Sequence, residues 1–329
     1  MIDADGAMAL HLGNAAHVVL ENIVIENSFP HGISIDDGGD HATPASGIVL
    51  RNVTIRRVGK GGNSDCLKLS GVDDFLITGS RFEGCDQGEG IDMVGCHHGR
   101  IESNRFVGMP GTGVQTKGGS SDIIVARNRF SDIGQRGVNL GGHTGEPYFR
   151  PLDAKFEAAR VTVEANVFER IGDAAVVYSG CDSCLVVNNT IVHEDRAAIA
   201  IVQENAERAS GRGGIFARNL IVFNTLWIFR KPGMRISADA AGQSHRLIDN
   251  VWASQWRQVD PAELPAGTHH LLSPETLFVD PTRGDFHPGP GNPTRGISAD
   301  PIFLPDSDYD GRAFDSADPE IGAFARARD

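Results

Sequence analysis

The sequence predicts an all-β solenoid in which parallel strands stack in successive coils. One observation is an asparagine that recurs once per coil and opens a short apolar run. The spacings of 23 to 38 residues are too long and uneven for a hairpin meander but typical of a solenoid with loop insertions. A second is the strand-like segment upstream of each asparagine, and a third is a composition with 40 glycines and few helical patterns. The recurring residues are Asn22, Asn52, Asn104, Asn128, Asn166, Asn189, Asn219 and Asn250, and Ser80 fills the one gap.

Each asparagine is expected to lie at a corner of its coil. Asparagine tolerates the left-handed backbone conformation of a tight turn. Its amide can also hydrogen-bond with the same residue one coil above and below. Because the coils of a β-helix stack about 4.8 Å apart, the position of a residue in the repeat predicts which surface it lines.

The upstream segments alternate between inward and outward positions with a period of two. The predicted inward set is Ile33, Ile35, Leu67, Leu69, Ile91, Met93, Val114, Val138 and Leu140. One predicted outward column is Ser34, Lys68, Asp92, Gln115, Asn139, Val177 and Ala200, and the next is Asp36, Ser70, Val94, Lys117, Gly141, Ser179 and Val202. Polar groups therefore gather on the middle coils and stop after Asn139.

The chain is expected to form one β-helix over residues 1–258 and a proline-rich tail over residues 259–329 that packs along the helix or caps it. Ten of the 16 prolines lie in those last 71 residues, and proline is excluded from central strands. Loop insertions are expected at 36–46, 141–160 and 203–214. The first two bracket the coils that carry Lys68, Asp92 and Lys117, so we expect them to form opposing walls of a binding trough.

Charge and cysteine content narrow the function further. The formal net charge of -13 excludes a nucleic-acid-binding protein on bulk electrostatics. Of the five cysteines, Cys181 and Cys184 form a turn with the spacing of half a zinc site, but buried free thiols are the favoured state. No signal peptide or membrane-spanning run is recognisable, and the repeat is in phase by Leu10, so we expect the chain to begin inside a longer protein.

The predicted chemical centre lies where polar outward positions fall on neighbouring coils. Lys68 and Asp92 should come within ion-pair distance, and Lys117 lies one coil beyond Asp92. A lysine that is desolvated or close to a second cation loses its proton more readily and can act as a base, although Asp92 opposes that change. Gln115 and Asn139 add amide donors to the column. The alternative is a ladder of ion pairs and amides on a solvated face.

Further candidate residues surround this centre. The titratable ones are Asp36, His97, Arg136 and His143. In the long insertion, Tyr148 could stack on a sugar ring and Arg150 could clamp a carboxylate. Surface decoration for the histidine and packing of the loop for Tyr148 and Arg150 are the alternatives.

Glycoside hydrolysis is a second chemical possibility, and it needs two carboxyl groups about 5 to 10 Å apart. Asp92 would be the central carboxylate. Its candidate partners are Asp65, Asp86 and Glu89, none of which shares its column, while Asp36 is two coils away.

A calcium loop is a candidate in the tail. Asp306, Asp308 and Asp310 are followed by Gly311 and match the opening of the D-x-D-x-D-G pattern. The twelfth position is Ala317 rather than glutamate, so a polar turn is the default interpretation and a Ca²⁺ site the alternative.

The asparagine corners and RNRF-like strands resemble the right-handed parallel β-helix (pectate-lyase-like) superfamily, which includes pectate lyases, polygalacturonases and the chondroitinase-B and alginate-lyase family. The resemblance covers about residues 7–255. The segment DSDYDGRAFDSADPEIGAFA also resembles the closing segment of many secreted bacterial β-helix proteins. The resemblance implies a right-handed helix and a secreted, periplasmic or cell-surface location. The superfamily contains lyases, hydrolases, epimerases and binding proteins.

One stretch, GVQTKGGSSDIIVARNRF, resembles the segment of chondroitinase-B-like lyases in which a lysine abstracts the proton beside a uronate carboxylate. The resemblance gives that role to Lys117. The arginine of the family on the following coil meets Gly141, so Arg136 or His143 would be the acid. The acidic calcium ligands of the family have no counterpart just before Lys117, and calcium is not implied there.

The leading hypothesis is therefore a polysaccharide lyase that cleaves a uronate-containing polymer by β-elimination. Lys117 would be the base, Lys68 with Gln115 and Asn139 would hold the carboxylate, and Arg136 or His143 would be the acid. A glycoside hydrolase centred on Asp92 and a non-catalytic glycan-binding surface protein are the alternatives.

Overall fold

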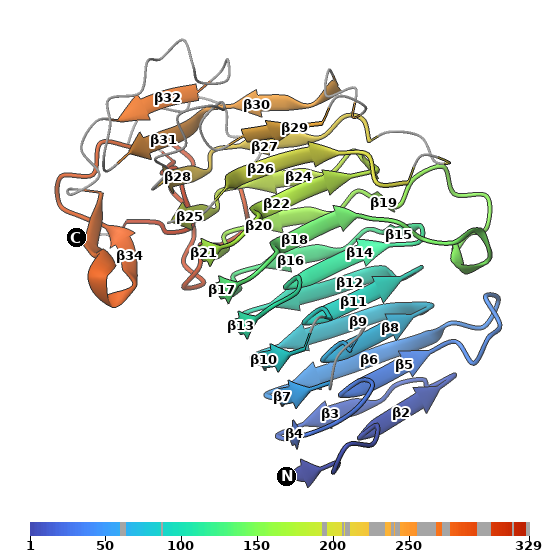
Figure 1. Cartoon of the computed structure of the whole chain (residues 1–329). Coiled ribbons are helices and arrows are strands. Elements are labelled where there is room, and N and C mark those ends of the chain that lie inside the picture. Colours follow the sequence, from blue (N-terminus) through green and yellow to red (C-terminus); the bar gives the residue numbers. More distant parts are fainter. Residues whose placement is uncertain are drawn as a thin grey trace.

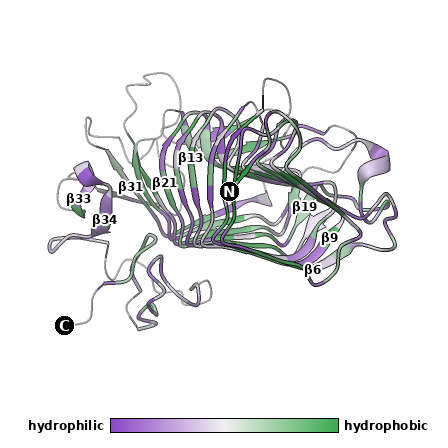
Figure 2. Ribbon diagram, turned by 90° about the horizontal axis from the view of Figure 1, so that it is seen from below, coloured by the Kyte–Doolittle hydropathy of each residue, from purple (hydrophilic) through white to green (hydrophobic). Residues whose placement is uncertain are grey.

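The chain winds as a parallel β-helix in which each coil contributes one strand to each of three sheets, A, B and C (Figure 1). The computed structural model describes residues 1–59, 64–86, 88–192, 196–205, 207, 211–223, 234–237, 240, 244–254, 268–271, 277–294, 304–317 and 319–326. Seen along the axis, the coils superpose around a shared interior, and the N-terminal coil lies in front (Figure 2).

Sheet B carries the predicted site and lies first in most coils. In order along the axis, its described strands are β2 (Leu10–Gly13), β5 (Ile33–Asp36), β8 (Leu67–Ser70), β11 (Ile91–Val94), β14 (Val114–Lys117), β18 (Arg136–Gly141), β22 (Ala174–Ser179), β26 (Ala197–Val202) and β29 (Met234–Ile236).

Sheet C follows sheet B in each coil. Its described strands are β3 (Val19–Glu21), β6 (Ala45–Arg51), β9 (Val72–Thr78), β12 (His97–Glu102), β16 (Ile124–Ala126), β20 (Thr162–Glu164), β24 (Leu185–Val187), β27 (Ile215–Ala217) and β30 (Arg246–Ile248), with the short strands β15 (Ser120–Ser121), β19 (Ala158–Ala159) and β23 (Cys181–Asp182).

Sheet A completes each coil. Its described strands are β1 (Ile2–Asp3), β4 (Val24–Glu26), β7 (Thr54–Val58), β10 (Arg81–Cys85), β13 (Arg105–Met109), β17 (Arg129–Ile133), β21 (Val167–Ile171), β25 (Thr190–Val192), β28 (Leu220–Phe223), β31 (Asn250–Ser254) and β32 (Thr268–Leu271). The pairing is parallel within all three sheets.

The interior confirms the predicted phase of the repeat. All nine residues of the predicted inward set are buried in one continuous apolar core. Phenylalanines stack from coil to coil on the inner side of sheet A, with ring centroids 4.9 Å apart for Phe82 and Phe106, 4.6 Å for Phe106 and Phe130, and 4.8 Å for Phe130 and Phe168. These distances match the step between coils, so identical side chains pack without a register shift.

The asparagines from Asn104 to Asn250 form a hydrogen-bonded ladder inside the corner between sheets C and A. The side-chain oxygen of Asn128 accepts hydrogen bonds from the backbone N–H of Asn104 at 2.9 Å and from its amide at 3.0 Å. The amide of Asn128 donates to the carbonyl of Ile101 at 2.8 Å and to Asn166 at 3.0 Å. Each rung therefore satisfies backbone and side-chain groups that are out of reach of water.

The left-handed conformation predicted for the corner asparagines is confirmed in the first two coils and is wrong from Asn104 on. Asn22 and Asn52 have positive φ values of 59° and 52° and lie one residue before the ladder position. From Asn104 on, the preceding residue takes that conformation, as Ser103 and Arg127 do with φ values of 58° and 55°. The asparagine repeat therefore shifts by one residue between the first two coils and Asn104, because asparagine suits both positions.

The cysteines differ from the expectation of free thiols. Cys66 is bonded to Cys85, and Cys181 is bonded to Cys184, with Cα–Cα distances of 5.5 and 6.1 Å. Cys96 is a buried free thiol. The expectation failed for four of the five. Cys66 and Cys85 lie on adjacent walls of one coil, a proximity that the strand pattern alone does not reveal, whereas Cys181 and Cys184 are three residues apart in a turn beside sheet C.

The two long insertions do not form opposing walls. Both leave the corner between sheets B and C, after β5 and after β18, and project from the same edge in Figure 1. The guanidinium of Arg150 in the second insertion, which contains the 3-10 turn η1 (Glu146–Tyr148), donates a hydrogen bond to the carbonyl of His41 in the first at 3.2 Å. They are one continuous rim because both are inserted at the same point of the repeat.

β32 (Thr268–Leu271) lies within the predicted tail but extends sheet A as its last described strand. From Leu277 on, the described part of the tail packs along the outer face of sheet A (Figure 1). It contains the antiparallel strands β33 (Phe278–Asp280) and β34 (Asp285–Pro288), joined by the 3-10 turn η5 (Pro281–Arg283). Its apolar residues Leu277, Phe278, Phe286, Ile321, Ala323 and Phe324 form a second core with Val167, Val192, Leu220, Val222, Val251 and Ala253. The expected boundary at residue 258 lies outside the described residues, and capping of the last coil stays a prediction.

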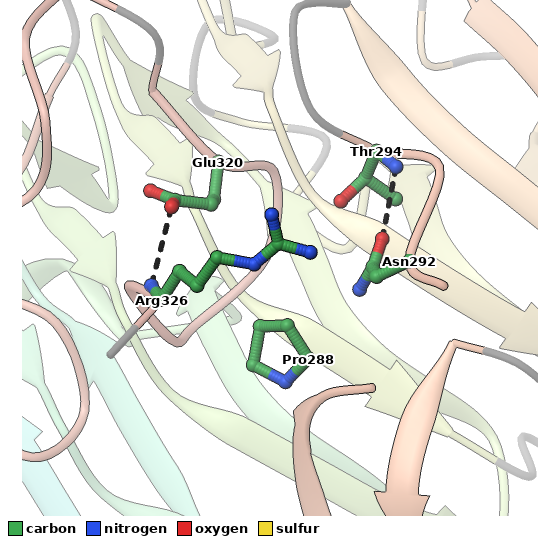
Figure 3. A pocket seen from close by; sticks show the side chains of 5 residues that line it. All are labelled: Pro288, Asn292, Thr294, Glu320 and Arg326. Atoms are coloured by element: carbon green, nitrogen blue, oxygen red, sulfur yellow. Dashed lines mark hydrogen bonds between the residues drawn. The ribbon is translucent and has the colours of Figure 1, made fainter. Parts of the chain in front are cut away.

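Turns of the tail enclose a small pocket lined by Pro288, Asn292, Thr294, Glu320 and Arg326 (Figure 3). The backbone N–H of Arg326 donates to Glu320 at 3.2 Å, and the backbone N–H of Thr294 donates to Asn292 at 2.9 Å. The pocket contains none of the predicted site residues. In the described ranges no helix has the length and apolar character needed to cross a membrane.

Replacing Asn128 by alanine is expected to destabilise the helix strongly. The change leaves the backbone N–H of Asn104 and the carbonyl of Ile101 buried without partners, at about 1–3 kcal/mol each. We expect urea denaturation to show a loss of roughly 2–6 kcal/mol in the free energy of unfolding. The control Asn22→Gly removes an exposed amide of the first coil and keeps the left-handed conformation. Equal losses in the two variants would contradict a dominant role for the buried ladder.

Candidate active site on the outer face of sheet B

The register of sheet B brings the predicted outward columns together. Lys68 pairs with Asp92, Asp92 with Gln115, and Gln115 with Asn139 as direct neighbours on adjacent strands. In the second column, Lys117 is the neighbour of Val94. The predicted adjacency is confirmed, whereas the chemical roles of these residues stay predictions.

Asp92 is the buried centre of this arrangement. It has no exposed surface, although it points away from the core. Lys68 forms a direct ion pair with it, and the ammonium of Lys117 lies 3.2 Å from Oδ1 of Asp92. The side chains of the two lysines are 19% and 16% exposed. Both ammonium groups therefore lie between a buried carboxylate and the solvent.

Two further carboxyl groups join Asp92 from the corner between sheets A and B. Asp65 and Glu89 each occupy the second position before a strand of sheet B, one coil apart. The backbone N–H of Glu89 donates to Oδ1 of Asp65 at 2.9 Å. Carboxyl oxygens of Asp65, Glu89 and Asp92 lie within 4.8 Å of one another. The disulfide of Cys66, the residue after Asp65, anchors this corner to sheet A.

Sequence reasoning considered Asp65 and Glu89 only as carboxylates outside the column of Asp92. Each of the two residues lies two positions before a strand of sheet B. This equal spacing in successive coils predicts that their side chains are neighbours at the corner. Asp86 shares neither that phase nor the cluster. His31, which was missed, has the same phase one coil earlier.

Glu89 retains its proton at neutral pH. Burial, a hydrogen bond with Asp65 and the negative charge of Asp92 raise its pKa to about 9. Burial would lower the pKa of Lys68, but the charges of Asp92 and Asp65 outweigh it and raise the value. With Glu89 neutral, the carboxylates of Asp65 and Asp92 balance the ammonium groups of Lys68 and Lys117, so a third negative charge would have no counter-ion.

His31 is a neutral neighbour of this cluster. Its Nδ1 accepts a hydrogen bond from the backbone N–H of Asp65 at 3.1 Å and lies 3.4 Å from the carboxylate of Asp65. Burial lowers the pKa of His31 against the opposing charge of Asp65. Because Nδ1 accepts a hydrogen bond, the proton of the neutral ring is on Nε2.

The three carboxyl groups could in principle hold a metal ion, given their separation of less than 4.8 Å. The ammonium groups of Lys68 and Lys117 already pair with Asp92, and Lys68 lies 3.9 Å from Asp65. The charges balance without a cation, so the residues favour lysine counter-ions over a metal. No chemical step is assigned to a metal here.

A buried carboxylate fixes the rim beside Lys117. Glu157 has no exposed surface and accepts hydrogen bonds from the backbone N–H groups of Gly118 and Thr144, both at 3.0 Å. The hydroxyl of Thr144 donates to it at 2.8 Å, and the amide of Asn205 donates at 2.6 Å. One side chain thus joins the insertions after β18 and β26 to the turn that follows Lys117.

Two predicted residues of the long insertion, Tyr148 and Arg150, lie in different surroundings. Tyr148 is 67% exposed. The guanidinium of Arg150 forms a two-point ion pair with Asp73 at 2.7 and 2.5 Å and also donates to the carbonyl of Gly95 at 2.9 Å. Binding of a substrate carboxylate by Arg150 stays a prediction and would require this ion pair to be shared.

The other predicted residues surround the cluster without joining it. Arg136 pairs with Glu204, and His143 is exposed. Asp36 lies 2.6 Å from the ring of His11 on the N-terminal coils. His97 begins a strand of sheet C, where Nδ1 lies 3.0 Å from the hydroxyl of Ser121; burial, followed by the charge of Arg150, lowers the pKa of His97. Their assigned roles stay predictions.

In the tail, the contacts of Asp308 favour the polar turn over the calcium site. Asp308 is buried and accepts hydrogen bonds from the backbone N–H groups of Asp310 at 3.0 Å, Arg312 at 2.6 Å and Ala325 at 2.9 Å. Its oxygens therefore serve the turn itself. In the described part of the chain, Asp306, Asp308 and Asp310 do not form a group that could hold a metal ion.

The protonated Glu89 is expected to make stability pH-dependent. Its pKa rises from 4.5 to about 9 on folding, so the stabilising contribution is complete below about pH 4.5 and is lost as the pH rises through about 9. Glu89→Gln removes this titration. In urea denaturation, we expect the free energy of unfolding of the variant to rise relative to that of the wild type between pH 5 and pH 9.

The control for this comparison is Glu83→Gln, which changes a carboxylate that is 43% exposed and paired with Arg81. Its difference from the wild type should vary little over the same range. A difference for Glu89→Gln that is also independent of pH would show that Glu89 is ionised in the folded protein.

Comparisons with known proteins give the family. The profile described as a right-handed β-helix region matches residues 2–154 and 41–221. No curated protein matches the sequence. Among solved structures, the surface protein and adhesin PfbA of Streptococcus pneumoniae is 12% identical and covers 79% of each chain, with a TM-score of 0.55. At this identity the likeness concerns the fold alone.

Two solved lyases also match. An alginate lyase from Paenibacillus is 14% identical, with 79% of this chain and 95% of that chain covered and a TM-score of 0.43. A pectate lyase from Bacillus in complex with trigalacturonate is 15% identical, with 74% and 82% covered and a TM-score of 0.46. The matched profile ranges together cover more than half of the 329 residues, and the chain therefore belongs to the right-handed β-helix family.

Proposed function

We propose that the chain is an enzyme that cleaves a uronate-containing polysaccharide by β-elimination on the outer face of sheet B. The observation that carries the proposal is a carboxylic acid that keeps its proton, Glu89, beside two partly exposed ammonium groups. These groups supply a proton donor and positive charge, which cleavage of an acidic glycan requires.

Each group has a defined task in the proposed reaction. Lys68 pairs with the uronate carboxylate and stabilises the negative charge that develops when the C5 proton leaves. Lys117, which has to release its ion pair with Asp92 and act as the amine, takes that proton. The electrons form a C4–C5 double bond and the C4–O bond breaks, while Glu89 donates its proton to the leaving oxygen. All protons and electron pairs are thereby accounted for.

Glu89 is a better candidate for the acid than either residue expected from the sequence. Arg136 is engaged by Glu204 and lies 3.7 Å from Asp173. His143 is an exposed residue of the insertion and makes no contact with the cluster in the described structure. Glu89 shares the cluster with Lys117, whose charge acts on it.

Hydrolysis is a second candidate because the cluster contains three carboxyl groups. Glu89 would again be the acid. The carboxylates of Asp65 and Asp92, however, are both fully buried. Because neither carboxylate is exposed to solvent, an attacking water or sugar carbon has no direct access to either of them, which favours β-elimination.

The disulfides of the protein support an extracellular substrate. Disulfides such as Cys66–Cys85 persist mainly in secreted and surface proteins. We propose a secreted, periplasmic or cell-surface location with a polysaccharide as the partner. A non-catalytic glycan-binding protein is the alternative from a different class, and glycan binding without product formation would favour it.

Lys117→Ala and Glu89→Gln are expected to remove most of the activity. Loss of a general base or acid lowers the rate by about 10²–10⁴-fold. Alginate and polygalacturonate are suitable substrates, and formation of the unsaturated product is followed by its ultraviolet absorbance. Lys155→Ala, at an exposed position, and Glu83→Gln, at a partly exposed one, are the matched controls. Full activity in Lys117→Ala would exclude it as the base, and new reducing ends without absorbance would identify hydrolysis.

The pH profile is expected to identify the catalytic acid. The rate should fall above about pH 9, where Glu89 loses its proton. The residual activity of Glu89→Gln should lack the falling limb in kcat/KM. A wild-type profile without that limb would contradict the role of Glu89 as the acid.

A further inference from the structure

We infer that the binding face on sheet B is closed on its C-terminal side, so that the enzyme accepts one end of a polysaccharide chain rather than its middle. The inference rests on the proposed function, and it adds a residue that determines specificity, Glu204. It follows from which strands of sheet B are covered and from what lies across them.

The outward column of sheet B that runs from His11 through Lys68 and Asp92 to Ala200 is more exposed on its N-terminal coils than between β18 and β26. On the C-terminal side, Val177 and Ala200 are fully buried although they face outward. Asn139 is 1% exposed and Gln115 is 9% exposed. On the N-terminal side, the side chain of His11 is 55% exposed. Asp92 is also fully buried, but it is covered by the partly exposed ammonium groups of Lys68 and Lys117. A ligand on this face is therefore admitted above these lysines and excluded over β22 and β26.

Glu204 lies across the face at the boundary between the two parts. Its carboxylate pairs with Arg136 and accepts a hydrogen bond from the hydroxyl of Ser179 at 3.0 Å. Burial alone would raise the pKa of Glu204, yet hydrogen bonding and charge from Arg136 lower it overall. Ser179 and Asn139 add hydrogen bonds to the same carboxylate. Glu204 therefore joins side chains of β18 and β22 above the strands.

The insertions on either side of Glu204 fix this boundary between the open and the covered part of sheet B. Next to Glu204, Asn205 is 3% exposed and donates to the buried carboxylate of Glu157 at 2.6 Å. At the other insertion, Gly142 has a φ of +145°, and a Cβ there would lie only 3.1 Å from the amide nitrogen of Gln115. The chain passes directly over the end of the column, so the closure is built into the fold.

The space left on the closed side fits very few sugar residues. Asn139 is two coil steps from Asp92, or about 10 Å at about 4.8 Å per step, and a pyranose residue is about as long as one step. The Oδ1 atom of Asn139 is buried without a hydrogen-bond partner in the described structure.

Binding of end-labelled oligosaccharides tests this inference without relying on turnover. Alginate and polygalacturonate oligomers carry a fluorophore at the reducing or the non-reducing end, and affinity for Lys117→Ala is measured by fluorescence anisotropy. We expect the two labels to differ in Kd by at least about tenfold, because only one chain end tolerates the added bulk. Equal affinities would overturn the closed end.

Glu204→Ala in the same background is expected to reduce that difference. Glu207→Ala is the matched control, because Glu207 is an exposed carboxylate in the same insertion. An unchanged difference in Glu204→Ala would overturn the assignment of Glu204. Unequal binding without cleavage by the wild-type protein would refute the proposed reaction and leave the closed face standing, whereas failure to bind either label would refute both.

Product sizes give an independent result with the active enzyme. A face that takes chain ends should release products of one or two sugar residues from the first minutes, with little loss of viscosity. Long oligosaccharides that appear first and shorten later, with a rapid loss of viscosity, would overturn the inference.

Discussion

The hydrogen-bonded register between successive coils determines every other feature of this molecule. The buried asparagine ladder satisfies the corner between sheets C and A, and the parallel pairing of sheet B fixes each outward side chain opposite its counterpart one coil away. Residues that are 24 positions apart in the sequence, such as Lys68 and Asp92, thereby become direct neighbours. Side chains at the same position of successive coils therefore lie next to each other on the outer face, and the insertions limit access to them.

Charge balance decides the chemical character of the cluster. Two ammonium groups neutralise two carboxylates, and the third carboxyl group, that of Glu89, remains protonated because ionisation would leave a buried charge without a counter-ion. The same balance makes a metal ion unnecessary. An acid that is kept neutral by its neighbours is suited to protonate a leaving oxygen.

The sequence was sufficient for the phase of the coils and for the column from Lys68 to Asn139, because period-two alternation and parallel pairing are local rules. It failed where the decisive contacts cross between walls of the helix. The disulfide of Cys66, the shared rim of Arg150 and His41, and the meeting of Glu89 with Asp92 depend on how corners fold in three dimensions. Asn22 and the ladder asparagines were given the same position because two adjacent corner positions both suit asparagine.

The protonation of Glu89 is the central claim, and a direct titration tests it. Glutamate labelled with ¹³C at the carboxyl carbon would be followed by NMR between pH 3 and pH 10, with Glu89→Gln identifying the resonance. We expect one glutamate to titrate near pH 9, far above the ordinary value of about 4.3. A resonance for Glu89 that shifts completely below about pH 6 would contradict the neutral acid and, with it, the mechanism built on it.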